Sequence, residues 1–277
     1  MYSLAKKLRP TKLSLTRFKE KLNELKMRAF VPKISFSIQY KNYLIKTADT
    51  FEEIKEMHLL RKEVFAKDYG ILDRDFGVDF SREDLIADHV ILIHQPTNQI
   101  IATYRMISST FSREFYSQSE YEIDSLVNSR ESKVELSRAC VHPDFRNGAA
   151  ITLIWRGLAK YVKESGARYL FGISSMPCPD PRLGALVNSQ VSPDSRGNQF
   201  EINVKNKFKV PIFQGGFVCV AEDLSLPSLL QAYLSAGAKI YGEPAYDKDF
   251  NSIDFFTLLD TQHMNPRHHE RYFESAP

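Results

Sequence analysis

The chain contains little cysteine, a single tryptophan and no long apolar run. The three cysteines, Cys140, Cys178 and Cys219, are odd in number and widely spaced, and they match neither a disulfide framework nor a metal-binding pattern. No stretch approaches the roughly 20 consecutive apolar residues that a membrane-spanning helix needs. The first residues carry charges but lack the apolar core of a secretory signal. These absences favour a reduced, cytoplasmic protein.

The charges are unevenly distributed. The 277 residues carry a net charge of +3 and are 43% apolar, which suits one large domain or two small ones. Residues 1–33 contain ten lysines and arginines against two glutamates, a net +8, so the remaining 244 residues sum to −5. The first part of the chain is therefore a strongly basic segment.

This segment also has helical apolar spacing. Its apolar residues recur at steps of three and four, between lysines: Leu15, Phe18, Leu22, Leu25 and Ala29. We predict that residues 1–36 form a basic amphipathic arm. Such a helix either binds an anionic membrane surface or an acidic protein, or packs on the main domain with its lysines in water. Nucleic acid is disfavoured, because no aromatic residues interleave with the charges and no reader motif is present.

Residues 37–277 have the pattern of one mixed α/β sheet rather than two domains. Thr50 and Glu53 form a capping box that opens a helix over residues 51–67, with an inward face made of Phe51, Ile54, Leu59 and Val64. Residues 175–215 contain five prolines and are predicted to be irregular, and a C-terminal extension follows from about residue 200. We expect further helices over residues 151–165 and 226–236, and strands over residues 43–46, 89–94, 99–108, 134–141, 168–174 and 253–259.

The segment 134–166 is the most informative. Alternation over residues 134–141 predicts a strand with Glu135, Ser137, Ala139 and Val141 on one face and Leu136, Arg138 and Cys140 on the other. A turn containing Gly148 leads into an amphipathic helix that Gly166 is placed to end. A helix that begins after a glycine turn presents free N–H groups and a positive dipole end, which suits phosphate. Arg146 adds a cation there. For Cys140 a buried strand thiol is favoured over a nucleophile.

Strand, V-x-P-x-x-R (Val141 to Arg146), glycine and helix together resemble the acyl-donor motif of the GNAT acyltransferase superfamily. The resemblance implies a mixed, mostly antiparallel central sheet flanked by helices. It also implies a donor whose pantetheine arm lies along the strand and whose phosphate lies in the turn. The donor-binding residues would be Ala139, Cys140, Val141, Arg146, Asn147, Gly148 and Ala149.

The turn is one residue shorter than the usual superfamily pattern, because Asn147 alone separates Arg146 from Gly148. A shorter turn offers fewer amides to phosphate. Coenzyme A carries a pyrophosphate there, whereas the prosthetic group of acyl carrier protein carries one phosphodiester. The short turn therefore favours acyl carrier protein as the donor.

Two closer families share further residues. Arg61 and Phe65, Arg105 and the run Glu135-Leu136-Ser137-Arg138 resemble acyl-homoserine-lactone synthases. The segment TLIWRGLAKY and the C-terminal LPSLLQAYLSAGAKIYGEPAYDKDFNSIDFFTLLD resemble more strongly the ornithine-lipid N-acyltransferases, also called haemolysin-like. The second resemblance covers about residues 40–262.

This resemblance implies transfer of a 3-hydroxyacyl chain from acyl carrier protein to the α-amino group of an amino acid, ornithine in the known case. No bound cofactor or metal is expected, and acyl-acyl carrier protein, or acyl-coenzyme A, is the co-substrate. One alternative is an acyl-homoserine-lactone synthase that uses S-adenosylmethionine. Another is a membrane-active lytic protein without catalysis.

The candidate catalytic residues are Glu135, Arg138 and Arg105. An ammonium acceptor must lose a proton before it attacks, and Glu135 is the candidate base, with an ion pair to either arginine as its alternative role. The two arginines suit the acceptor carboxylate or a structural role. The N–H groups around Ala139 and Cys140 are candidate donors to the oxyanion.

The remaining candidates concern the acceptor. Arg61 and Phe65 are assigned to acceptor binding by resemblance alone. In the acidic stretch of residues 68–88, Asp79 and Asp88 are candidates for the cationic end of ornithine, although a solvated surface has the same composition. His263, His268 and His269 fit no metal-ligand pattern and read as a solvated tail.

Overall fold

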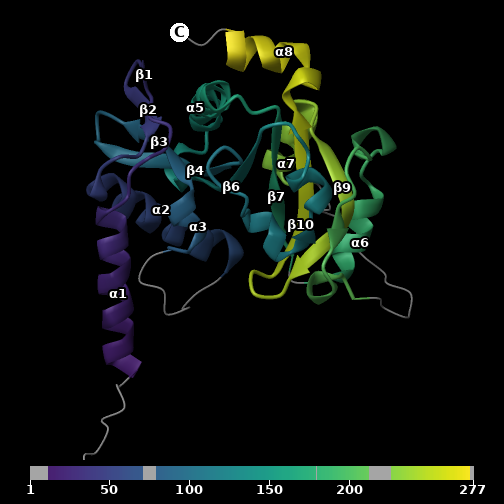
Figure 1. Cartoon of the computed structure of the whole chain (residues 1–277), viewed down its shortest axis with the longest axis horizontal. Helices are drawn as coiled ribbons and strands as arrows, with labels where there is room; N and C mark the ends of the chain where they lie inside the picture. The colour runs from purple at the N-terminus through teal and green to yellow at the C-terminus, as the bar shows by residue number, and fades with distance from the viewer. Residues whose placement is uncertain (1–11, 71–78, 179, 212–225, 275–277) are drawn as a thin grey trace, which may run out of the picture.

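The computed structural model describes residues 12–70, 79–178, 180–211 and 226–274. They form an eight-stranded sheet in the order β1-β2-β3-β4-β6-β7-β10-β9 (Figure 1). Among these residues neighbouring strands are antiparallel, except β6 and β7, which are parallel. The predicted mixed, mostly antiparallel sheet is confirmed. Its strands are β1 (Ser37–Tyr40), β2 (Tyr43–Thr47), β3 (Asp88–His94), β4 (Gln99–Ser108), β6 (Lys133–Val141), β7 (Tyr169–Pro177), β9 (Lys239–Asp247) and β10 (Ser252–Asp260).

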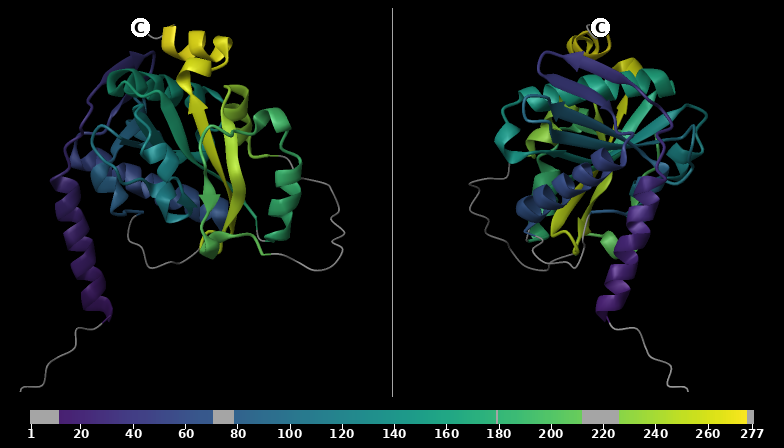
Figure 2. Two further views of the ribbon diagram at one scale, coloured as in Figure 1. Left: turned by 45° about the vertical axis from the view of Figure 1, so that its right-hand side comes forward. Right: turned by 90° about the vertical axis from the view of Figure 1, so that its left-hand side faces the viewer.

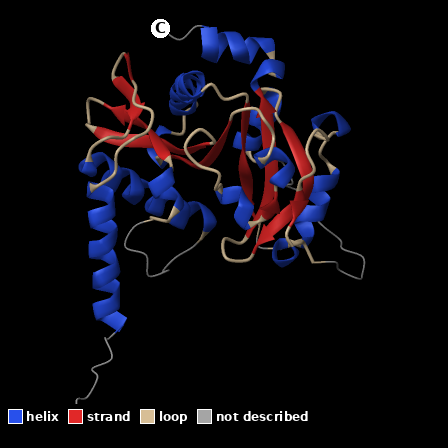
Figure 3. Cartoon of the chain, in the orientation of Figure 1, coloured by secondary structure: helices blue, strands red, loops and turns tan. Residues whose placement is uncertain are grey.

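Helices cover both faces of this sheet (Figure 3). The apolar side of α2 packs with β3 and β4 residues on one face, and α5 packs on the other. The helices are α1 (Lys12–Arg28), α2 (Phe51–Tyr69), α3 (Glu83–Ile86), α4 (Asp124–Val127), α5 (Ala149–Ser165), α6 (Arg182–Ser189), α7 (Ser228–Ser235) and α8 (Pro266–His269). Short turns of helix are η1 (Tyr116–Ser119), η2 (Pro143–Phe145), η3 (Pro193–Ser195), η4 (Asn206–Phe208), η5 (Thr261–His263) and η6 (Glu270–Glu274), and β5 (Tyr121–Glu122) pairs with β8 (Asn203–Val204).

The predicted start and end signals of these helices are present. Thr50 and Glu53 form the expected capping box of α2. Gly148 at φ 81° begins α5 and Gly166 at φ 63° ends it, both in the left-handed region where glycine carries no Cβ penalty. The predicted inward position of Leu59 is wrong, because this side chain is 39% exposed while Leu60 is buried. Ile54 and Val64 of the predicted stripe are buried, so the prediction is off by one residue at Leu59 alone.

The parallel strands β6 and β7 separate soon after they meet. Three residue pairs join them, the last being Glu135 with Phe171. At the next position Gly172 lies against the Leu136 carbonyl, and a Cβ there would come within 2.1 Å of that oxygen. Glycine therefore permits the close approach from which the two strands diverge. The gap that opens beyond this point holds the candidate site.

A β-bulge interrupts β6. Cys140 pairs with Thr103 and Ser137 with Arg105, so Arg138 and Ala139 together oppose one residue of β4. Arg138 has φ 51°, a strained value for an arginine. The predicted alternation is wrong beyond Ser137, because the bulge places Ala139 and Val141 in the same core as Leu136. One extra residue in a strand reverses the faces of all that follow.

Other differences concern the C-terminal half. The segment 175–215 is not irregular throughout, since it contains the end of β7, helix α6 and strand β8. Strands β1 and β9 were not predicted. His268 and His269 lie in α8 rather than in a solvated tail, and Tyr272 beyond them is buried.

Helix α1 projects away from the body of the protein (Figures 1 and 2). Met27 is buried at its C-terminal end and packs with Ile54, Val64 and Phe30. Leu22 and Leu25 are 41% and 64% exposed, so these two members of the predicted stripe do not pack on the domain. Leu15 and Phe18 belong to the part of the helix whose side chains are not described. Among the described residues no helix has the length and apolar character needed to cross a membrane.

Candidate active site

A cavity follows the gap between β6 and β7. Its walls come from residues 136–139 of β6 and residues 172–175 of β7. One end is apolar and aromatic, and is lined by Tyr104, Trp155, Leu158, Ala159, Tyr233, Leu259 and Tyr272. The other end is polar, and is lined by Tyr69, Tyr116, Glu120, Arg138, Ser175, Asp247, Phe250 and Asp254. The cavity therefore suits a molecule with an apolar chain and a charged head.

Arg138 is the cation at the polar end. Its guanidinium carbon lies 5.1 Å from the ring centre of Tyr116, 5.5 Å from that of Phe250 and 5.7 Å from that of Phe65, within cation–π range. Its Nε lies 3.5 Å from Asp79 Oδ2. Burial lowers the pKa of Arg138, but Asp79 and other partners raise it further, so the group stays charged. The bulge and this aromatic cage hold a permanent cation at the cavity wall.

Behind Arg138 lies a buried network of arginines and aspartates. Arg61 donates from Nε to Asp79 Oδ2 at 2.7 Å and from Nη1 to Asp84 Oδ1 at 2.7 Å. Arg105 lies 3.5 Å from Asp84 Oδ1 and donates from Nε to Ser137 Oγ at 2.9 Å. Arg61, Arg105 and Asp84 are all buried, and none of them lines the cavity. Among the predicted residues, this network links Arg61, Asp79, Arg105 and Arg138.

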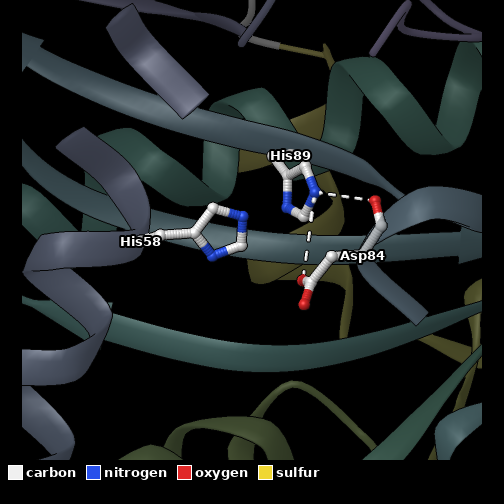
Figure 4. A group of neighbouring side chains, drawn as sticks. All are labelled: His58, Asp84 and His89. Carbon is white, nitrogen blue, oxygen red and sulfur yellow. Dashed lines mark hydrogen bonds and ion pairs between the residues drawn. The ribbon is translucent and has the colours of Figure 1, made fainter. Parts of the chain in front are cut away.

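Two histidines complete this network, as Figure 4 shows. His58 and His89 lie beside Asp84, and one nitrogen or oxygen atom of each of the three residues lies within 4.8 Å of the others, close enough to share a metal ion. Burial lowers the pKa of His58 to about 4 and that of His89 to about 3, so both are neutral. However, Asp84 already faces two guanidinium groups, from Arg61 and Arg105. The positive charge of these two groups opposes binding of a metal ion, so we interpret His58, Asp84 and His89 as a structural group.

Glu135 is fully buried behind the cavity and is not part of its lining. Its carboxylate accepts hydrogen bonds from the N–H of Tyr116 at 2.6 Å and from the N–H and Oγ of Ser117 at 2.6 and 2.5 Å. Burial raises the pKa of Glu135, and the bonds from Ser117 oppose that shift. These bonds attach η1 to the motif strand. The predicted role of Glu135 as a base stays a prediction.

The predicted donor turn is exposed on the surface. Arg146 donates to both carboxylate oxygens of Asp68, at 3.1 and 2.6 Å, and to the Val141 carbonyl at 3.1 Å. Asn147 Oδ1 accepts from the N–H of Ala149 at 3.1 Å. Cys140 is buried, and burial raises the pKa of its thiol to about 12, as expected for a strand thiol that is not a nucleophile.

Asp88 lies apart from the cavity. Its carboxylate accepts from the N–H groups of Lys33 and Ile34, at 2.7 and 3.1 Å, and from the Tyr161 hydroxyl at 2.8 Å. These bonds fix residues 33–34 to the sheet. The geometry gives no support to an acceptor-binding role for Asp88, and Asp79, which binds Arg61, does not line the cavity either. Both roles stay predictions.

The acidic groups that do line the cavity are Glu120, Asp247 and Asp254. Sequence reasoning missed them, because they come from three segments that show no shared motif. Tyr116 was missed for the same reason. Trp155, the single tryptophan, is 8% exposed, and it stacks on Tyr233 at the apolar end of the cavity.

Residues 60–156 match the acetyltransferase (GNAT) domain family. An L-ornithine N(alpha)-acyltransferase of Rhodobacter capsulatus is 31% identical over 252 residues, which cover 83% of this chain and 95% of that protein. The enzyme of the same name from Brucella abortus is 25% identical and covers 84% of this chain and 89% of its own length.

Two solved structures align with this chain over most of its length. An N-acyl amino acid synthase from uncultured soil microbes aligns with a TM-score of 0.48 at 10% identity, over 83% of this chain and 96% of that one. A coenzyme-A-dependent acyl-homoserine lactone synthase aligns with a TM-score of 0.47 at 15% identity, over 80% of this chain and 82% of that one. The sequence relatives decide the assignment: this chain is an N-acyltransferase with a GNAT domain, and it belongs to the family of the L-ornithine N(alpha)-acyltransferases.

Proposed function

We propose that the chain transfers a long acyl chain, with a 3-hydroxyacyl chain as the expected group, from acyl carrier protein to the α-amino group of ornithine. The observation that carries this proposal is the two-ended cavity along the β6–β7 gap, which is apolar and aromatic at one end and charged at the other. The relatives named as ornithine acyltransferases support the choice of acceptor.

The acyl chain would lie at the aromatic end, with its thioester where β6 and β7 diverge. The free α-amine attacks the thioester carbonyl, a C–N bond forms, the C–S bond breaks, and the thiolate takes a proton. Main-chain N–H groups near Ala139 and Cys140, at the bulge, are proposed to stabilise the oxyanion. The pantetheine arm would run beside β6 up to Val141.

At the charged end, Arg138 is proposed to bind the acceptor's α-carboxylate through a two-pronged guanidinium contact. Phe65 and Tyr116 flank it. Arg61, Asp79 and Arg105 are proposed as positioning residues, because their hydrogen bonds fix the guanidinium from behind. Glu135 has two possible roles here: it either accepts the α-ammonium proton, or it positions Tyr116 through η1, the role that its hydrogen bonds favour.

The phosphate of the donor is proposed to bind at the N-terminus of α5, at residues 146–149, in place of Asp68 beside Arg146. The exposed basic helix α1 is proposed to contact either the acidic surface of acyl carrier protein or an anionic membrane, which would make the enzyme a peripheral protein on the cytoplasmic face. Lys21, Lys26 and Arg28 lie beside the exposed Leu22 and Leu25 and support this role.

The test is a reconstituted reaction followed by mass spectrometry. Purified protein is incubated with 3-hydroxyacyl-acyl carrier protein or the matching acyl-coenzyme A, and with ornithine, glycine or S-adenosylmethionine as acceptor. We expect N-acylornithine, formed faster from the carrier-protein donor. An acyl-homoserine lactone as the main product would reverse the assignment. Absence of any acylated amino acid, with both donors intact, would refute it.

A further inference from the structure

Three carboxylates converge at the polar end of the cavity. Glu120 follows η1, Asp247 ends β9 and Asp254 lies in β10, and one carboxylate oxygen of each lies within 4.8 Å of the others. Sheet pairing fixes the positions of Asp247 and Asp254, because Asp254 pairs with Ser175 of β7 and Asp247 pairs with Ser252 of β10. The Tyr121 hydroxyl donates to the Asp254 carbonyl at 2.6 Å and thereby fixes the residue that follows Glu120. We call this group the acidic cluster.

The acidic cluster is buried and incompletely hydrogen-bonded. Glu120, Asp247 and Asp254 are 2%, 7% and 2% exposed. Asp247 Oδ1 accepts from the N–H groups of Asp249 and Phe250, at 2.7 and 3.2 Å. Glu120 Oε2, Asp254 Oδ1 and Ser252 Oγ have no hydrogen bond of good geometry within the described part of the chain. The side chains that act on the pKa of Asp254 through hydrogen bonding are Ser175, Glu120 and Ser252. Buried polar atoms with poorly formed hydrogen bonds are costly, and at a cavity wall a bound cationic group would supply the donors that they lack.

The charge of the cluster is also unbalanced. Asp84, equally buried, faces Arg61 and Arg105, whereas none of the described lysines or arginines forms an ion pair with a member of the acidic cluster. Burial, reinforced by Asp254, raises the pKa of Glu120 to about 9, and burial raises that of Asp254 to about 6. A cation placed among the three oxygens would favour their ionised forms and would supply well-formed hydrogen bonds.

We propose that Glu120, Asp247 and Asp254 form the subsite for the side-chain ammonium of a diamino acid acceptor. This inference rests on the proposed function and deepens it. Arg138 lines the same end of the cavity and lies close enough to lower the pKa of Glu120. The α-carboxylate then binds Arg138, the distal ammonium binds the acidic cluster, and the α-amine between them faces the β6–β7 gap. An ammonium has three donors, which matches three acceptor side chains.

The test compares ornithine with norvaline, which has the same carbon chain and no distal amine. Calorimetric titration of the wild-type protein should give at least about 30-fold tighter binding for ornithine, the range expected when a buried charged partner is lost. In Glu120→Gln and Asp254→Asn this preference should fall towards one, while norvaline binding stays unchanged. Glu122→Gln, an exposed glutamate two residues away, is the matched control and should keep the full preference.

Several results would overturn the inference. They are equal wild-type affinity for the two amino acids, an unchanged preference in both cluster variants, and a requirement for Mg²⁺ or Ca²⁺ in ornithine binding. The wild-type comparison needs no variant, and melting temperatures report the folding of the variants. The two proposals fail separately. Selective ornithine binding without acylation would refute only the proposed reaction. Acylation of ornithine with an unchanged preference in both cluster variants would refute only the subsite.

Discussion

Arg146 holds Asp68 through two parallel hydrogen bonds across the surface, from the start of the motif turn to the last turn of α2. Because this pair is exposed, it contributes little to stability, at most about 1 kcal/mol. If Arg146 binds the donor phosphate, Asp68 competes with that phosphate for the same guanidinium. Arg146→Ala should therefore raise KM for the acyl donor about tenfold, and Asp68→Asn should lower it.

The two variants control for each other, because Arg146→Ala should raise the KM for the donor whereas Asp68→Asn should lower it. KM for ornithine should not change in either. A common rise in the donor KM would mean that the ion pair only fixes the turn.

Arg138→Lys tests the acceptor carboxylate site. Lysine keeps the charge but loses the planar fork that binds a carboxylate through two nitrogens. We expect kcat/KM for ornithine to fall about 100-fold, with the donor KM preserved. Arg130→Lys, at an exposed position, is the control and should leave kcat/KM for ornithine unchanged. Equal losses for donor and acceptor would place Arg138 in the scaffold instead.

The aromatic end of the cavity should set acyl-chain length. Ala159 is buried on α5 and lines the cavity, so the larger side chain in Ala159→Phe should shorten the cavity. The preferred chain should become several carbons shorter when a series of acyl donors is compared. Lys160→Phe places the same ring on the same helix outside the cavity and should leave the profile unchanged. If folded Ala159→Phe keeps the wild-type preference for chain length, the acyl chain does not bind at this end of the cavity.

The acidic cluster predicts a pH dependence. The raised pKa of Glu120, about 9, keeps it protonated at neutral pH in the empty site, whereas a bound ammonium favours the ionised form. Ornithine binding therefore releases a proton, and the ratio of ornithine to norvaline affinity should rise as pH increases from about 6 towards 9. Asp254, with a pKa of about 6, adds to the rise at the acid end.

Tyr69, Tyr116 and Arg138 at this end do not titrate in the same range. The pKa values of Tyr69 and Tyr116 are raised to about 12, chiefly by burial, and Arg138 stays charged. Taking the ratio removes the titration of the α-amino group that both ligands share. In Glu120→Gln the slope should flatten, and a slope as steep as in the wild type would exclude Glu120 as its source.

Helix α1 should act through its exposed leucines. Replacing Leu22 and Leu25 together with serine should weaken binding to anionic vesicles several-fold in a sedimentation assay, because apolar burial at the interface is lost while the charges remain. Val31→Ser, at an exposed apolar position beyond the helix, is the control. Turnover with a soluble donor and acceptor should not change. If vesicle binding persists, the leucines serve another contact, and the carrier protein is the next candidate to test.

The local features of this fold could be predicted from the sequence. The strand–turn–helix of residues 133–166 depends on neighbours along the chain, namely alternating residues, a glycine turn and a helical stripe that ends at Gly166. The capping box at Thr50 is local too. By contrast, nothing local marks the bulge at Arg138, because the residue is not a glycine and its strain is held by β4 and by the cage around its guanidinium.

The candidate site itself could be predicted only in part. Arg138 was found because it lies in the motif strand. Glu120, Asp247 and Asp254 become neighbours only when β10 pairs with both β7 and β9, and β9 was not predicted at all. Each carboxylate taken alone has the sequence context of a surface residue. Long-range pairing, rather than composition, makes them a group.

The early separation of β6 and β7 opens a cavity in the interior of the enzyme. Only three residue pairs join the two strands before Gly172, and beyond them residues 136–139 of β6 and 172–175 of β7 line the cavity. An acyl chain bound there would become part of the hydrophobic core, and each buried methylene would contribute about 0.8 kcal/mol. If the acyl chain binds there as proposed, the donor should stabilise the folded domain against unfolding as well as take part in the reaction.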